Sequence, residues 1–164
     1  MQLAKETLAK NNINVWDFAG AISQGLEKGR GKMRNVILIG EGNCGKTFLL
    51  RPLCSIYRAF SNPASGSFAW LGVQNAEVIF LNDFRWQPQT IAWGVFPALL
   101  EGDAMHFSAP KTSYAEDIFI DRDTPIFATS SDHIQKGVNA GRENRMTRKR
   151  WTHFEFTLKF QRAI

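Results

Sequence analysis

A glycine-rich stretch directly after a short apolar run limits the fold of this chain more than any other part of the sequence. It extends from Gly40 to Thr47 and reads Gly-Glu-Gly-Asn-Cys-Gly-Lys-Thr, and the apolar residues 36–39 before it predict a buried strand. A helix-compatible run, 46–50, follows. A strand, a loop of the form Gly-x-x-x-x-Gly-Lys-Ser/Thr and a helix, in this order, predict a P-loop that binds a nucleoside triphosphate.

The P-loop pattern gives each of its residues a task. Backbone N–H groups curl round the phosphates, which glycine permits, while Lys46 reaches the phosphates and the Thr47 hydroxyl reaches the magnesium ion. We therefore expect ATP and Mg²⁺ as cofactors. The residues predicted to contact the nucleotide here are Gly40, Glu41, Gly42, Asn43, Cys44, Gly45, Lys46, Thr47 and Phe48.

Length and composition predict one folded domain. The chain has 164 residues with 44% hydrophobic and 21% charged residues, and no apolar stretch approaches the ~20 residues that span a bilayer. The first residues lack the apolar core of a secretion signal, so we expect an intracellular, reducing location, the nucleus or the cytoplasm. Cys44 and Cys54 are then free thiols, since a bond between them would distort the phosphate loop.

The residues before the P-loop predict helices. Asn14 can cap an amphipathic helix that extends to Lys28, Gly29 can end it, and a shorter helix precedes it. We divide the chain into an N-terminal helical oligomerisation segment, 1–34, and a core, 35–164. The apolar face of the helix must cover the core or meet a neighbouring subunit, and the sequence leaves these two alternatives open.

Two further strands end in polar residues. The apolar run 78–81 ends at Asn82 and Asp83, which is typical of a Walker B strand, whose carboxylate holds magnesium or polarises a water molecule. A strand at 125–128 runs into the polar residues 129–132, and 151–158 alternates like a strand. The pattern predicts an α/β fold with a central, mostly parallel sheet.

Other segments give weaker expectations. Pro52 should kink or break the P-loop helix, a short strand is expected at 68–71, and helical pieces at 90–101 with Pro97 in a first turn. A hairpin is expected at 102–114 and another strand at 117–120.

Taken in order, these motifs resemble the superfamily 3 helicases, the replication motors of parvoviruses, papillomaviruses, polyomaviruses and small circular single-stranded DNA viruses. The resemblance extends over roughly 35–156 and is closest to the parvovirus type. It implies a P-loop AAA+ core that hydrolyses ATP between the subunits of a ring, with a hexamer as the expected homo-oligomer and single-stranded or replication-fork DNA as the partner. No membrane partner is implied.

The same resemblance implies roles for residues outside the P-loop. Asn82 and Asp83 stand at the paired acidic positions, with Asp83 as the magnesium ligand and water-polarising group. Ser131 occupies the position where an asparagine senses the γ-phosphate, and it is shorter. Arg150 stands at the position of an arginine finger, with Arg148 as the second choice.

A hairpin containing His106 and Lys111 matches the DNA-touching segment of the family. Asn82 in place of an acid, and Ser131 in place of Asn, are departures that put hydrolysis in question. They support the alternative of a nucleotide-binding, poorly hydrolysing assembly module. A third alternative is a small-molecule P-loop kinase, against which the order of motifs argues.

The net charge of +5 is unevenly distributed. Basic residues crowd just before the first strand and again near the end, which favours a polyanionic partner, with solvated surface as the alternative. The residues of these two groups are Lys28, Arg30, Lys32 and Arg34, and then Arg142, Arg145, Arg148, Lys149 and Arg150.

Overall fold

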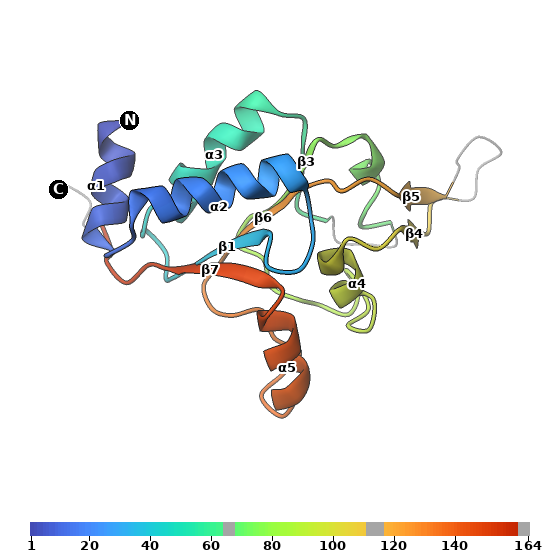
Figure 1. Cartoon of the computed structure of the whole chain (residues 1–164). Helices are drawn as coiled ribbons and strands as arrows, with labels where there is room; N and C mark the ends of the chain where they lie inside the picture. The colour runs from blue at the N-terminus through green and yellow to red at the C-terminus, as the bar shows by residue number, and fades with distance from the viewer. Residues whose placement is uncertain (64–67, 111–116, 161–164) are drawn as a thin grey trace.

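The computed structural model describes residues 1–63, 68–110 and 117–160, which form a three-layer α/β fold (Figure 1). The helices are α1 (Gln2–Lys10), α2 (Val15–Lys28), α3 (Lys46–Ile56), α4 (Phe96–Glu101) and α5 (Gly141–Arg148), with a 3-10 turn at Val73–Asn75. The strands are β1 (Asn35–Ile39), β2 (Ala59–Ser61), β3 (Val78–Leu81), β4 (Met105–Phe107), β5 (Ile118–Ile120), β6 (Ile126–Ser130) and β7 (Trp151–Glu155). Among the described helices, none has both the length and the apolarity that a membrane crossing requires.

The central sheet has five parallel strands in the order β2-β3-β6-β1-β7. The predicted α/β class with a central parallel sheet is therefore confirmed. Strand β1, which leads into the P-loop, lies between β6 and β7, and β6 separates it from β3. Because all five strands run in one direction, their carboxyl ends lie at one edge of the sheet.

Alternate side chains of the strands enter two separate apolar clusters. In β1, Val36 and Leu38 join the cluster formed with α1, α2 and α3, whereas Ile37 and Ile39 join the cluster formed with α4 and β5. This period of two is what an extended strand with both faces covered requires. Each such buried side chain contributes roughly 1.5–3 kcal/mol to folding, so the sheet is held from both sides.

The predicted helix after Asn14 is confirmed. The Asn14 side chain accepts hydrogen bonds from the backbone N–H groups of Trp16 (2.8 Å) and Asp17 (3.2 Å), and the helix ends at Gly29 with φ of 74°. Its apolar face packs, with α1 and α3, on the sheet (Figure 1). The apolar face of α2 therefore covers the core, which was one of the two alternatives. The oligomerisation role of residues 1–34 stays a prediction.

Pro52 does not break the P-loop helix. Helix α3 continues through it to Ile56. Proline removes one backbone hydrogen bond, but Leu50 and Leu53 on either side are buried against the sheet. Tertiary packing therefore holds the last turn of the helix.

The prediction of a strand at 68–71 is wrong. The described residues there form turns, and Trp70 is buried with its ring stacked between Phe60 and Phe107 at centroid distances of 5.6 and 5.0 Å. The strand next to β3 is instead β2, which comes earlier in the chain. The apolar residues of 68–71 thus fill the space beside the sheet rather than extend it.

Two separately predicted segments form one hairpin. Strand β4 pairs antiparallel with β5, and Met105 lies opposite Ile120. The hairpin is thus longer than the expected 102–114, and the strand expected at 117–120 is its second arm. Residues 111–116 lie outside the described residues.

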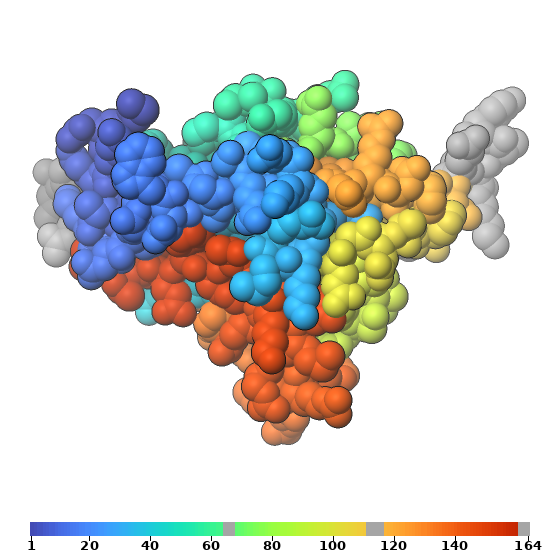
Figure 2. All heavy atoms as spheres, viewed as in Figure 1, coloured from blue at the N-terminus to red at the C-terminus, as the bar shows by residue number. Residues whose placement is uncertain are grey.

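Helix α4 begins near Pro97, as expected for a proline in a first turn, although residues 90–95 form turns rather than a helix. Helix α5, in the arginine-rich segment, was not expected. It forms a projection on the molecule (Figure 2).

The basic residues before the first strand were expected at the surface, and for Arg30 this expectation is wrong. Its side chain is fully buried, and its guanidinium donates to the carbonyl oxygens of Leu99 (2.9 Å), Asp103 (2.6 Å) and Arg122 (3.2 Å). Burial lowers the pKa of Arg30, and the carboxylates of Asp123 and Asp103 act in the opposite direction. Arg30 thus joins the end of α4 to the segment that follows the hairpin.

Candidate functional site

Three loops meet at the carboxyl edge of the sheet. The P-loop follows β1, Asn82 and Asp83 follow β3, and Ser131 follows β6. Strand pairing places Ile39 opposite Ser130, and the Gly40 N–H donates to the Ser130 carbonyl (3.1 Å). The parallel sheet therefore brings together the residues that the sequence placed at the ligand edge.

The P-loop depends on backbone angles that most residues avoid. Gly45 has φ of 86° and Asn43 has φ of 63°, and the loop leads directly into α3. A side chain on Gly40 would collide with the Phe156 carbonyl. The loop is thus shaped by glycine and leaves the first N–H groups of α3 free to point at an anion.

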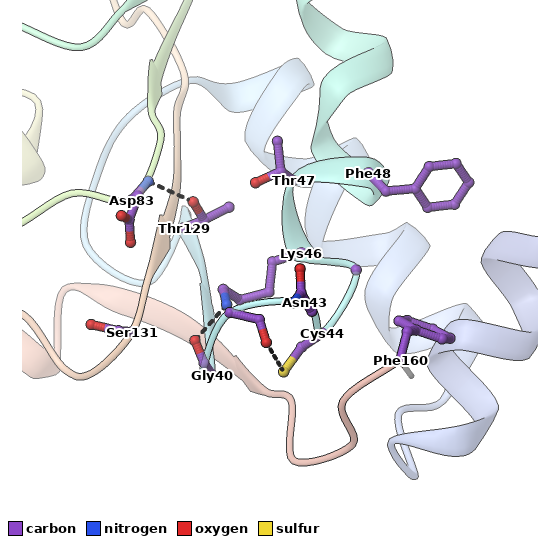
Figure 3. Close-up of a pocket in the computed structure, with 12 residues that line it drawn as sticks. Gly40, Asn43, Cys44, Lys46, Thr47, Phe48, Asp83, Thr129, Ser131 and Phe160 are labelled. Carbon is purple, nitrogen blue, oxygen red and sulfur yellow. Dashed lines mark hydrogen bonds between the residues drawn. The ribbon is translucent and has the colours of Figure 1, made fainter. Parts of the chain in front are cut away.

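Lys46 folds back over the loop. Its Nζ donates to the carbonyl oxygens of Gly40 and Glu41, the latter at 2.6 Å (Figure 3). Burial lowers the pKa of Lys46, and the Cys44 thiol and the Asp83 carboxylate act in the opposite direction. A triphosphate would offer this ammonium stronger, charged acceptors in place of two carbonyls.

A chain of hydrogen bonds joins the P-loop helix to the end of β3. The hydroxyl groups of Thr47 and Thr129 both donate to Oδ1 of Asn82, at 2.9 and 3.0 Å. The Thr129 hydroxyl also accepts from the N–H of Asp83 at 2.7 Å, and Asp83 has φ of 49°. Asn82 thus holds the Thr47 hydroxyl, and Thr129 fixes the turn that presents Asp83.

Thr129 was not among the predicted site residues. It lines the cavity, and it is the residue through which β6 reaches the turn after β3. The signal in the sequence was its place in a polar run directly after a predicted strand. That signal cannot show which backbone N–H the hydroxyl will meet.

A cavity of about 560 Å³ opens over the P-loop. Its lining includes Lys46, Thr47, Asp83 and Ser131, and Figure 3 shows Asp83 and Ser131 on the side of Lys46 away from the phenyl ring of Phe48. Hydroxyl and carboxylate oxygens are ligands that Mg²⁺ accepts, and the ion usually keeps waters and substrate phosphates as its other ligands. The residues present therefore fit nucleotide-bound magnesium. The full lining is Gly40, Gly42, Asn43, Cys44, Gly45, Lys46, Thr47, Phe48, Asp83, Thr129, Ser131 and Phe160.

Two predicted contacts lie outside this lining. The Glu41 carboxylate forms an ion pair with Lys159, which lowers the pKa of Glu41, and Asn82 lines a neighbouring cavity. Within the described residues, no three His, Cys, Asp or Glu side chains are grouped to hold a metal ion on their own. Cys44 and Cys54 are free, as predicted.

Arg150 lies at the other end of the sheet. It precedes β7, whose first residue pairs with Asn35, five residues before the P-loop begins. Its guanidinium donates to Glu101 (2.6 Å) and to the Met146 carbonyl (2.5 Å), and its side chain is 12% exposed. Arg150 therefore does not enter the cavity of its own chain. A role toward a neighbouring subunit stays a prediction, and Arg148, at the end of α5, is exposed.

The predicted nucleic-acid residues are on the hairpin. His106 is exposed on β4, and its ring stacks on Phe119 of β5 at 4.4 Å. Lys111 lies outside the described residues. His106 does not line the cavity over the P-loop, and it lines a separate cavity beside Trp70.

A histidine pair beside Arg148 predicts a pH dependence. His153 packs against His133 with ring centroids 5.1 Å apart, and His133 lies 3.5 Å from Glu155. Burial, followed by the charges of His133 and Arg148, lowers the pKa of His153 to about 4, with Glu155 opposing. In the unfolded chain, His153 binds a proton near pH 6.5, whereas in the folded chain it does so only near pH 4.

Stability should therefore fall as the pH is lowered through this window. Urea midpoints measured from pH 7 to pH 4.5 should drop less steeply for His153→Gln than for the unchanged protein. His106→Gln serves as the control and should keep the original slope. Equal slopes for all three proteins would contradict the depressed pKa of His153.

The comparisons with known proteins support the fold. No known sequence family and no curated protein matches the chain by sequence. Among solved structures, the helicase of JC virus matches with a TM-score of 0.56 at 12% identity. The match covers 87% of this chain and 39% of the helicase chain, so the chain spans about two fifths of that protein. This likeness shows a helicase-like α/β fold.

Proposed function

We propose that this chain is the ATP-hydrolysing core of a superfamily 3-like DNA helicase motor from a viral or virus-derived replication protein. The observation that carries the proposal is the cavity in which the P-loop, Thr47 and Asp83 lie together, joined through Asn82 and Thr129. The fold shared with a viral helicase supports it. Its place of action would be the nucleus or the cytoplasm.

In this proposal the phosphates of ATP lie on the P-loop and the first turn of α3. Lys46 leaves the carbonyls of Gly40 and Glu41 and neutralises the β- and γ-phosphates. Thr47 and Asp83 would hold magnesium, which would supply further neutralisation of the phosphate charge. Asp83 polarises the attacking water, and Ser131 approaches the γ-phosphate from the end of β6.

Lys46 is the only Lys or Arg among the residues that line the described cavity, and we assign a further cation to a neighbouring subunit. An arginine placed against the γ-phosphate stabilises the transition state and contributes ~10³ or more in rate. Arg148 is exposed at the end of α5, whereas Arg150 donates hydrogen bonds to the Glu101 carboxylate and the Met146 carbonyl. We therefore propose that Arg148 reaches the neighbouring site and that Arg150 holds α5 against α4.

DNA contact is assigned to the hairpin. It carries His106 on β4, and Lys111 is in the segment between its arms. In a hexameric ring, hydrolysis at the subunit contacts would move these hairpins along a single strand.

Mixing two inactive variants tests the shared site. Lys46→Ala lacks a working P-loop and Arg148→Ala lacks the arginine, so each alone should hydrolyse ATP slowly. In a mixed ring, about a quarter of the sites combine an intact loop with an intact arginine, so the mixture should regain activity. The ATPase rate per subunit of the unchanged protein should also rise with protein concentration. A mixture no more active than its parts, with a rate independent of concentration, would overturn the shared site.

Asn82 provides a prediction about hydrolysis. Its amide oxygen already accepts the hydroxyls of Thr47 and Thr129, and a carboxylate of the same shape can do so while adding charge beside magnesium. Asn82→Asp should raise the Mg²⁺-dependent ATPase rate by about tenfold, as expected for one added electrostatic interaction in a transition state. Steady-state phosphate release measures it, and Asn75→Asp is the matched control, because Asn75 is exposed in the 3-10 turn and lies outside the cavity lining. An unchanged rate in Asn82→Asp would contradict a limiting carboxylate.

A second candidate function is a nucleotide-binding assembly module that hydrolyses poorly. One observation favours it, because Asp83 is the sole carboxylate residue in the described lining of the cavity. Phosphate release with and without single-stranded DNA separates the two. A motor should be stimulated by DNA, and a module should bind ATP tightly and release little phosphate in either case.

A further inference from the structure

The cavity over the P-loop has two chemically different ends. Figure 3 shows Asp83 and Ser131 on one side of the loop and the rings of Phe48 and Phe160 on the other. Both rings are unusually open for phenylalanine, with 49% of Phe48 and 38% of Phe160 exposed. The Lys10 ammonium lies 6.0 Å from the centroid of the Phe160 ring, and both rings keep a large part of their surface exposed at the cavity.

The order of groups along the loop gives the orientation of a bound triphosphate. Lys46 marks the β- and γ-phosphates, and the first turn of α3 receives the phosphates nearer the nucleoside. Phe48 is in that first turn, directly after Thr47. A triphosphate whose last phosphate meets Asp83 must therefore place its nucleoside toward Phe48 and Phe160.

Phe160 belongs to a segment that is held against the P-loop. We call residues 156–160, which follow β7, the strap. They are bonded to the P-loop and to the residue that ends α1. The Phe160 N–H donates to the Asn43 carbonyl (2.8 Å), and the Phe156 N–H donates to the Ile39 carbonyl (2.7 Å). The strap thus bonds to the P-loop at one end and to the last residue of β1 at the other.

The buried side chain of Asn11, which directly follows α1, holds the middle of the strap. Asn11 is 7% exposed, and its Oδ1 accepts from the N–H groups of Thr157 (2.9 Å) and Leu158 (3.0 Å). Its Nδ2 donates to the Thr7 carbonyl (2.9 Å). Because these bonds join protein groups to one another, the fold itself sets the position of Phe160, and little ordering is left to occur on binding.

We propose that Phe48 and Phe160 form the base subsite of the nucleotide site, and that it accepts purine nucleotides by contact with the faces of the rings. This proposal rests on the proposed function of the P-loop. Aromatic rings bind bases through their faces and not their edges, so they distinguish adenine from guanine weakly. Purines offer a larger face than pyrimidines. ATP and GTP should then bind with similar affinity, and CTP more weakly.

Calorimetric titration of the full chain tests the subsite, with Mg²⁺ and four ligands: ATP, GTP, CTP and inorganic tripolyphosphate. Phe48→Ala and Phe160→Ala should each weaken ATP binding by about tenfold, the range of one lost base–aromatic contact, and leave tripolyphosphate within about twofold. Phe160→Trp should retain ATP affinity and Phe160→Leu should not. Phe68→Ala is the matched control, because Phe68 is 37% exposed and does not line the cavity.

The outcomes separate the subsite from the P-loop. If tripolyphosphate binds but both alanine variants bind ATP as the unchanged protein does, the subsite is wrong and the phosphate site stands. If neither ATP nor tripolyphosphate binds to folded protein, the proposed function itself fails. A preference of ATP over GTP by more than about tenfold would also overturn the proposal, because face contacts cannot supply it. Asn11→Ala should weaken ATP binding more than tripolyphosphate binding, since it releases the strap that carries Phe160.

Discussion

Lys46→Ala should reduce Mg²⁺-ATP binding by at least about 100-fold and bring ATP hydrolysis to background. In the proposed complex with ATP, the Lys46 ammonium would exchange the carbonyls of Gly40 and Glu41 for phosphate oxygens. Hydrogen bonds between ionised partners are about twice as strong as neutral ones, and Lys46 is partly shielded from water by the loop. Removing it leaves the phosphate charge opposed only by backbone N–H groups and magnesium.

The measurement is calorimetric titration together with phosphate release. Lys5→Ala is the control, because Lys5 is exposed on α1 and outside the cavity lining. Lys46→Arg keeps the charge and should bind ATP more tightly than Lys46→Ala while hydrolysing slowly, since its planar fork does not reproduce a single ammonium. If Lys46→Ala binds Mg²⁺-ATP within about threefold of the unchanged protein, the cavity is not a phosphate site.

The second large effect concerns stability. Arg30→Ala should lower the free energy of unfolding by roughly 3–5 kcal/mol, the range for breaking a buried charged interaction. The change leaves the carbonyls of Leu99, Asp103 and Arg122 without their donor and opens a cavity at the end of α4. Since total stability of a domain is about 5–15 kcal/mol, the variant should be close to unfolding.

Urea unfolding measures the loss. Arg58→Ala is the matched control, because the Arg58 side chain is 76% exposed and paired only at the surface with Glu77, and it should cost at most about 1 kcal/mol. Arg30→Lys should recover little, because one ammonium cannot reach three carbonyls in the directions of a planar guanidinium. A loss below about 1 kcal/mol for Arg30→Ala would contradict a structural role.

Elements with local signals were predictable. Asn14 and Gly29 mark the ends of α2, and the apolar runs of β1, β3 and β6 mark buried strands. Once parallel strands were inferred, the meeting of the P-loop with Asp83 at one edge followed from the direction of the chain. Fold class and the main part of the candidate site therefore depend on residues close together in sequence.

Elements defined by distant partners were not predictable. Strand β2 is three residues long and exists because it pairs with β3, and α5 has no side chain that caps its start. Arg30 appears in a basic cluster, and its acceptors are at least 69 residues away. The strap shows the same limit, since Asn11 and Thr157 are separated by 146 residues. No local pattern contains these pairings.

The contacts of the strap with the phosphate loop have a mechanical consequence. A force that lifts the strap would pull on Asn43 and Ile39 and so distort the surface that receives the triphosphate. Thermodynamic linkage makes this relation reciprocal: whatever lifting does to ligand affinity, a bound ligand does equally to the work of lifting. If the site binds nucleotide as proposed, a load applied to residues 156–160 would thus change the fraction of sites that hold nucleotide.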